Sequence, residues 1–324
     1  MRVDLSAYAD GRPRVSPVQR SLILKSLPGF SALSGAELAT LAAFVTERVF
    51  RKGETMLEPG QPAMSIFLVI DGEVEMFLDG LSIGTYTSRT SVGAVPALAR
   101  DPRGAHAIAR SDVFALELDA EEMDELFEDN HNLIVGVLGA LARTLRELQE
   151  KQGGVAMPGK VYPDYPAPRG LTLVDKMFVL RATDNFKEVS IEALSEIAES
   201  AHEVYYEQGK SIWRRGAPAS HSLMIVSGCV IARPPGGEPQ PFTSRWIVGG
   251  LDDLGNLPRW YDLHAETDTV ALKLSSTHLF DLFEDYPEMG LKMLRGFAQG
   301  ALSLQERALL REHGIRSTRS PTHE

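Results

Sequence analysis

Apolar positions along the chain follow a helical rhythm in several places. The segment "GAELATLAAFV", residues 35–45, spaces its leucines and alanines as one face of a helix, and residues 190–201 have a comparable pattern. Two longer segments continue this rhythm at spacings of three and four residues. Their apolar positions are Ile134, Leu138, Leu141, Leu145 and Leu148 in the first, and Leu294, Phe297, Ala301 and Leu304 in the second. This heptad-like spacing is compatible with a dimer seam or with a helix packed on its own domain.

Between these helical segments the apolar residues come in short runs that glycines interrupt. Examples are "SIFLVIDGEVEMFLDG" at residues 65–80 and "SLMIVSGCVIAR" at residues 222–233. Short apolar runs separated by glycine-containing turns are typical of antiparallel strands. The pattern therefore predicts the order helix, antiparallel strands, helix, twice along the chain.

The two halves of the chain are related by an internal repeat. The stretch "VGAVPALARDPRGAHAIARSD" begins at Val92, and "VGGLDDLGNLPRWYDLHAETD" begins 156 residues later at Val248. Both keep Val-Gly, Leu, Pro-Arg and a closing Asp at the same places. The same shift aligns many other positions, including Gly53 with Gly209, Gly60 with Gly216, Gly72 with Gly228, and "LFED" at 126–129 with "LFED" at 282–285. A constant register without insertions indicates a duplicated domain.

A proline- and glycine-rich segment separates the two copies and predicts an extended linker. The fold class expected is α+β, with two jelly-roll-like antiparallel β-rolls that are each flanked by helices. The predicted organisation is an N-terminal tail at 1–16, a first domain at 17–151, the linker at 152–170, a second domain at 171–313 and a C-terminal tail at 314–324.

Composition narrows the class of protein further. The formal net charge of −11 disfavours nonspecific binding to nucleic acid. Cys229 is the single cysteine, so a multi-cysteine metal site is excluded and a reducing compartment fits. No apolar run reaches the length of a membrane span, and the first residues lack the apolar core of a signal peptide. We therefore expect a cytoplasmic protein that binds no metal, nucleic acid or membrane.

The repeated unit resembles the cyclic nucleotide-binding domain, as found in the regulatory subunit of cAMP-dependent protein kinase and in the catabolite activator family. "KGETMLEPGQPAMSIFLVIDGEVEMF" and "QGKSIWRRGAPASHSLMIVSGCVIA" look like the β-roll of that family, and the resemblance covers about residues 22–310. The stretches that begin at Val92 and Val248 fall where the family has its phosphate-binding cassette. The resemblance implies a β-roll fold and a site for a cyclic nucleotide.

The resemblance also implies which residues would form each site. In the family a glycine opens the cassette turn, a glutamate binds the ribose 2′-hydroxyl, and an arginine after a proline binds the cyclic phosphate. An arginine suits this task because it donates charge-assisted hydrogen bonds to an anion. The matching candidates for ligand binding are Gly93, Ala94, Arg103, Gly104 and Ala105 in the first cassette, and Gly249 and Arg259 in the second.

Several positions depart from the family pattern. Ala94 and Gly250 stand where the family has the ribose glutamate, and Pro96 removes an amide donor from the first cassette. In the second cassette, Asp252 and Asp253 put two carboxylates where a phosphate would lie. Both sites are therefore expected to be degenerate, the second more than the first. The alternative for each arginine is a structural role beside a local carboxylate, Asp101 for Arg103 and Asp262 for Arg259.

Two aromatic residues follow the second arginine. Trp260 and Tyr261 stand where the family has small residues. Because Trp, Tyr and Arg are enriched in interface hot spots, one hypothesis makes them part of a surface for a partner or a second copy. The alternative is that the two rings fill the empty pocket and stabilise the roll.

No arrangement of residues indicates catalysis, since the chain lacks a nucleophile elbow, a P-loop and a dinucleotide fingerprint. We expect a non-enzymatic regulatory or adaptor protein that acts through protein–protein contacts, with a homodimer as one arrangement and no cofactor beyond a weakly bound cyclic nucleotide. The alternative function is a cyclic nucleotide sensor that uses the first pocket.

Overall fold

The structure is a computed structural model that describes residues 15–27, 30–31, 33–102, 105–155 and 169–312. Its elements follow the predicted order twice. The first copy contains α1 (Pro17–Lys25), α2 (Gly35–Phe44), β1 (Thr46–Phe50), β2 (Thr55–Leu57), β3 (Ser65–Asp71), β4 (Val74–Leu78), β5 (Leu81–Tyr86), β6 (Ser91–Val92), α3 (Ala94–Ala99), β7 (His106–Ala109), β8 (Val113–Asp119), α4 (Ala120–Asp129) and α5 (His131–Gln152).

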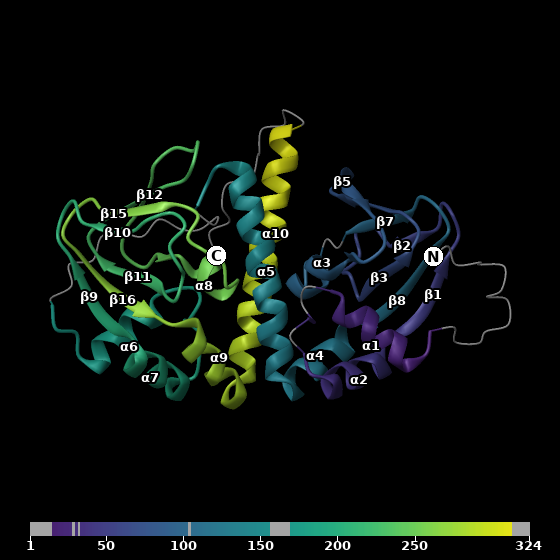
Figure 1. The fold of residues 1–324 in the computed structure, drawn as a ribbon, viewed down its shortest axis with the longest axis horizontal. Helices are drawn as coiled ribbons and strands as arrows, with labels where there is room; N and C mark the ends of the chain where they lie inside the picture. Colours follow the sequence, from purple (N-terminus) through teal and green to yellow (C-terminus); the bar gives the residue numbers. More distant parts are fainter. Residues whose placement is uncertain (1–14, 28–29, 32, 103–104, 156–168, 313–324) are drawn as a thin grey trace. The chain divides into compact units, whose positions relative to one another are not determined.

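The second copy repeats this series element by element. Figure 1 labels most of these elements in both copies. It contains α6 (Leu173–Arg181), α7 (Ile191–Ser200), β9 (His202–Tyr206), β10 (Ser211–Trp213), β11 (Ser222–Ser227), β12 (Val230–Arg233), β13 (Gln240–Phe242), β14 (Ile247–Val248), α8 (Gly250–Leu254), β15 (Asp262–Ala265), β16 (Thr269–Leu274), α9 (Ser276–Asp285) and α10 (Pro287–Glu312).

Each copy folds its strands into two four-stranded antiparallel sheets. The first roll has the orders β1-β8-β3-β6 and β2-β7-β4-β5, and the second has β9-β16-β11-β14 and β10-β15-β12-β13. The second pair of orders is the first pair with each strand replaced by its repeat counterpart. The predicted fold class, two antiparallel β-rolls flanked by helices, is confirmed.

Residues that are identical in the two copies stabilise the backbone at corresponding turns. Gly53 and Gly209 have φ values of +89° and +78°, a left-handed conformation that suits glycine. The aspartate that closes each repeated stretch supports the same turn. Asp112 Oδ1 accepts a hydrogen bond from the amide of Lys52, and Asp268 Oδ1 accepts one from the amide of Gln208, both at 2.9 Å. The repeated Asp is therefore a structural residue of the roll.

Helix starts are set by side-chain caps. Ser34 accepts from the amide of Glu37 while the Glu37 carboxylate accepts from the amide of Ser34, which is a capping box at the start of α2. Thr172 and Asp175 form the same pair at the start of α6. In Figure 1, α1 lies beside α2 in the first copy and α6 lies beside α7 in the second.

The chain divides into two compact units whose boundaries fall inside the long helices. Residues up to 137 form one unit together with the part of α10 from Leu294 onward, and residues 138–293 form the bulk of the other. Each unit is thus a β-roll completed by part of the long helix of the other repeat. For the long helices, the sequence suggested packing on their own roll or a dimer seam. The predicted domain boundaries, 17–151 and 171–313, stay a prediction.

Among the described residues, no helix is long and apolar enough to cross a membrane.

Candidate functional site

The second cassette begins at a glycine that the site geometry requires. Gly249 follows β14 with φ +77° and precedes α8. A Cβ atom at this position would lie 2.3 Å from Nη1 of Arg259 and 2.9 Å from the Trp213 ring. Because glycine has no Cβ, the Arg259 guanidinium can rest against the cassette backbone.

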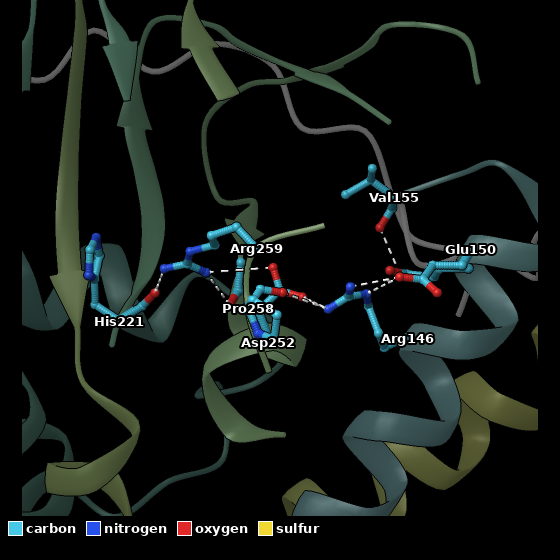
Figure 2. A network of polar contacts seen from close by, with 9 residues as sticks. Arg146, Glu150, Val155, His221, Asp252, Pro258 and Arg259 are labelled. Atoms are coloured by element: carbon cyan, nitrogen blue, oxygen red, sulfur yellow. Dashed lines mark hydrogen bonds and ion pairs between the residues drawn. The ribbon is translucent and has the colours of Figure 1, made fainter. Parts of the chain in front are cut away.

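Arg259 is buried and bonded to protein acceptors. Only 2% of the residue is exposed, and Nη1 donates to the Gly249 carbonyl at 2.8 Å. Nη2 donates to the carbonyl of His221, and the guanidinium carbon lies 4.1 Å from the centroid of the Trp213 ring. Figure 2 shows the guanidinium between His221 and the cassette. The predicted phosphate arginine therefore directs its donors into the protein.

Asp252 brings a carboxylate to the same place. It is 1% exposed, and its Oδ2 lies 3.8 Å from Arg259 Nη1. Its Oδ1 accepts a 2.6 Å hydrogen bond from Nη1 of Arg146, a residue of α5 (Figure 2). Arg146 also donates to the Pro258 carbonyl at 3.0 Å and pairs with Glu150. One buried carboxylate thus lies between two guanidinium groups.

Burial dominates the electrostatics of this network. It raises the pKa of Asp252 to about 6, against the opposing effect of Arg146 and Arg259. Burial also lowers the pKa of Arg259 and raises the pKa of Tyr261. The pKa of His221 falls to about 4, because burial and the nearby Lys273 and Arg259 disfavour its protonated form.

The other acidic residues of this cassette have different partners. Asp253 Oδ2 accepts from the amide of Ser276 at 3.0 Å, at the start of α9. Asp262, considered from sequence as the partner of Arg259, accepts instead from the amide of Arg215 at 2.8 Å. The carboxylate beside Arg259 is that of Asp252.

Three aromatic rings occupy the interior of the second roll next to Arg259. Trp213, Trp260 and Tyr261 are 8%, 6% and 2% exposed, and they belong to one core cluster with strand residues of the roll. The ring centroids of Trp213 and Tyr261 are 5.8 Å apart, and those of Trp260 and Tyr261 are 5.6 Å apart. This burial favours the pocket-filling alternative, because a buried ring offers little area to a partner.

The first cassette begins with the same left-handed glycine and has smaller side chains at the matching positions. Gly93 has φ +84° and precedes α3, in which Pro96 is buried. Leu57, Gly104 and Ala105 are the repeat counterparts of Trp213, Trp260 and Tyr261, and Ala105 is 5% exposed. The candidates Arg103 and Gly104 lie outside the described residues.

The end of α3 is held by side chains of α10. Gln299 Nε2 donates to the carbonyl of Ala99 at 3.3 Å, and Asp124 pairs with both Arg100 and Arg295. A cavity of about 200 Å³ opens beside these contacts. Its lining residues are Ala99, Arg100, Asp101, Pro102, Gln299, Leu302 and Ser303.

Sequence reasoning missed Arg146 as a member of the second site. Its repeat counterpart is Leu302, so an arginine stands where the other copy has an apolar residue. An arginine at an otherwise apolar, buried position is the signal that could have indicated a buried ionic partner. Among the described residues, no group of three or more histidine, cysteine, aspartate or glutamate side chains could hold a metal ion.

Comparison with known proteins gives one family model, described as the cyclic nucleotide-binding domain, which matches residues 47–130. The chain is also similar to Glutaminase 1 of Bradyrhizobium diazoefficiens, with 29% identity over 125 residues. That match covers 38% of this chain and 20% of the relative, so the chain spans only a fifth of the length of that protein.

Among solved structures, the chain is similar to "cAMP bound PfPKA-R (141-441)", with 15% identity, a TM-score of 0.37, and coverage of 95% of this chain and 94% of the other. It is also similar to the regulatory subunit of a cAMP-independent protein kinase A from Trypanosoma brucei, with 18% identity, a TM-score of 0.35, and coverage of 92% and 90%. From the family match and the repeated strand order, the chain carries tandem domains of the cyclic nucleotide-binding fold, the first of which matches the family model at residues 47–130.

Proposed function

We propose that this protein is a non-enzymatic, cytoplasmic regulatory protein that acts through protein–protein contacts, and that its second roll binds no cyclic nucleotide. The observation that carries the proposal is the buried network of Arg146, Asp252 and Arg259. A cyclic phosphate at Arg259 would either displace the Asp252 carboxylate from its two arginines or lie beside it as a second buried negative charge. Unpaired buried charge is strongly unfavourable.

The first roll differs from the second, because it has smaller side chains at the matching cassette positions. Ala94 nevertheless replaces the ribose glutamate, and Pro96 supplies no amide donor. Loss of a hydrogen bond to a charged acceptor costs ~1.5–3 kcal/mol, which corresponds to roughly a ten- to more than hundredfold loss of affinity. We therefore expect a cyclic nucleotide to bind the first roll weakly.

Titration calorimetry of the full chain with cAMP, cGMP and cyclic dinucleotides tests the proposal. We expect no binding tighter than tens of micromolar, roughly the limit set by the lost hydrogen bonds. Arg259→Ala provides the comparison for the second roll. A submicromolar isotherm that Arg259→Ala abolishes would show that the second roll is a ligand site and would overturn the proposal.

The second candidate function is a cyclic nucleotide sensor that uses the first roll. It is favoured by Leu57 and Ala105, which are smaller than Trp213 and Tyr261 at the matching positions of the second roll. In that case the same titration gives a submicromolar isotherm that Arg103→Ala abolishes and Arg259→Ala leaves unchanged. The two variants therefore assign any observed binding to one roll.

A further inference from the structure

The contacts of Asp252 have the form of a bound oxyanion. Its carboxylate is 1% exposed, accepts a 2.6 Å hydrogen bond from Arg146 and lies 3.8 Å from Arg259. Guanidinium groups bind carboxylates and phosphates through the same donor geometry. The two arginines therefore form a site whose chemistry is selective for a small oxyanion, with the occupant supplied by the chain itself.

Both guanidinium groups are fixed independently of Asp252. Arg259 is held by the carbonyls of Gly249 and His221 and by the face of Trp213. Arg146 is held by the Pro258 carbonyl and by Glu150. Removal of the Asp252 carboxylate would leave two oriented positive groups around a buried space.

The first roll lacks this arrangement. The repeat counterpart of Asp252 is Pro96, and the counterpart of Arg146 is Leu302. The carboxylate and the second guanidinium therefore occur together in the second roll and are both replaced in the first.

We propose that Asp252 is an internal ligand: its carboxylate occupies an oxyanion site formed by Arg146 and Arg259 and thereby excludes external oxyanions from the second roll. This inference rests on the proposed function and names the residue that closes the site. It implies that the site accepts a small oxyanion, such as formate, when the carboxylate is removed.

Chemical rescue tests this inference in the full chain. Asp252→Ala should lower the melting temperature by about 10 °C in sodium chloride, because two buried arginines lose the carboxylate that lies between them. Sodium formate at equal ionic strength should restore at least half of that loss with a saturable concentration dependence. Formamide, which has a similar shape to formate and no charge, should not restore it.

Two variants serve as matched controls. Asp252→Asn fills the same space without charge and should respond equally to formate and chloride. Asp253→Ala removes the neighbouring buried carboxylate, whose Oδ2 accepts from the Ser276 amide, and should show no rescue. Wild-type protein should likewise respond equally to both salts, since its own carboxylate fills the site.

A response of Asp252→Ala to formate no larger than that of wild type would overturn the inference. Where this variant aggregates in chloride, the yield of refolded protein replaces the melting temperature, and equal yields in formate and chloride would also overturn it. Either failure leaves the proposed function intact, because that proposal fails only through cyclic nucleotide binding in the calorimetric titration.

Discussion

Gly249 allows a direct test of how tightly the second cassette is packed. An alanine there would adopt φ +77° and place its Cβ 2.3 Å from Arg259 Nη1. We predict that Gly249→Ala destabilises the protein by at least about 3 kcal/mol, because displacement of Arg259 breaks a buried charged network. Urea denaturation measures this change in the free energy of unfolding.

The matched control is Gly209→Ala. Gly209 has φ +78°, nearly the same backbone conformation, and a Cβ added there would have no neighbouring atom within 4 Å. Its substitution should cost only about 1–2 kcal/mol for a left-handed alanine. Equal losses for the two variants would mean that backbone conformation alone sets the cost at Gly249.

At the residue scale, positions that are identical in the two copies and positions that differ have different roles. The residues kept in both copies, such as Asp112 and Asp268, support turns, and this role follows from an unchanged fold. The changed residues Asp252 and Arg146 form the buried network. The sequence predicted that Asp252 would oppose a phosphate, but not that it would pair with Arg146, because the two lie 106 positions apart in the chain.

At the element scale, the space between β10 and the second cassette is filled by aromatic rings. Trp260 is 6% exposed and lies edge-on to Tyr261, with ring centroids 5.6 Å apart. We predict that Trp260→Ala costs ~3–5 kcal/mol of stability, because it leaves a cavity in a packed core. Thermal or urea unfolding measures the loss.

Phe178→Ala is the control for this substitution. Phe178 lies on α6 in the same unit and is 71% exposed, so its removal should change stability by less than about 0.5 kcal/mol. A variant Trp260→Ala that melts like wild type and loses association with a partner would favour the interface hypothesis over pocket filling.

The strands and helices were predictable because their periodicity is local, whereas the partner of each long helix was not. An apolar stripe shows that one face of a helix is buried, but it does not identify what covers that face. The covering surface is shown by equivalent hydrogen bonds in the two units. Gln299 donates to the Ala99 carbonyl, and Arg143, its repeat counterpart, donates to the Gly255 carbonyl.

At the scale of the whole molecule, each compact unit is assembled from both repeats. The unit that contains the first roll includes α10 residues from Leu294 onward, and the other unit begins within α5 at Leu138. The sequence repeat alone suggests two domains that fold separately. A repeat boundary, however, marks only where the sequence pattern restarts. Division into units depends instead on packing between distant segments.

Expression of the two halves separately tests this division. We predict that chains covering 1–155 and 169–324 are each poorly folded alone, because each roll then lacks the helix segment that completes its unit. Mixed and refolded together, they should recover the circular dichroism spectrum and the cooperative melting of the full chain. A full chain that is cut between residues 156 and 168 after folding is the control, since the cut removes covalent continuity without removing either segment. A monomeric 1–155 chain with a cooperative transition as stable as that of the full chain would contradict the prediction, because it would show that the first roll is complete without α10.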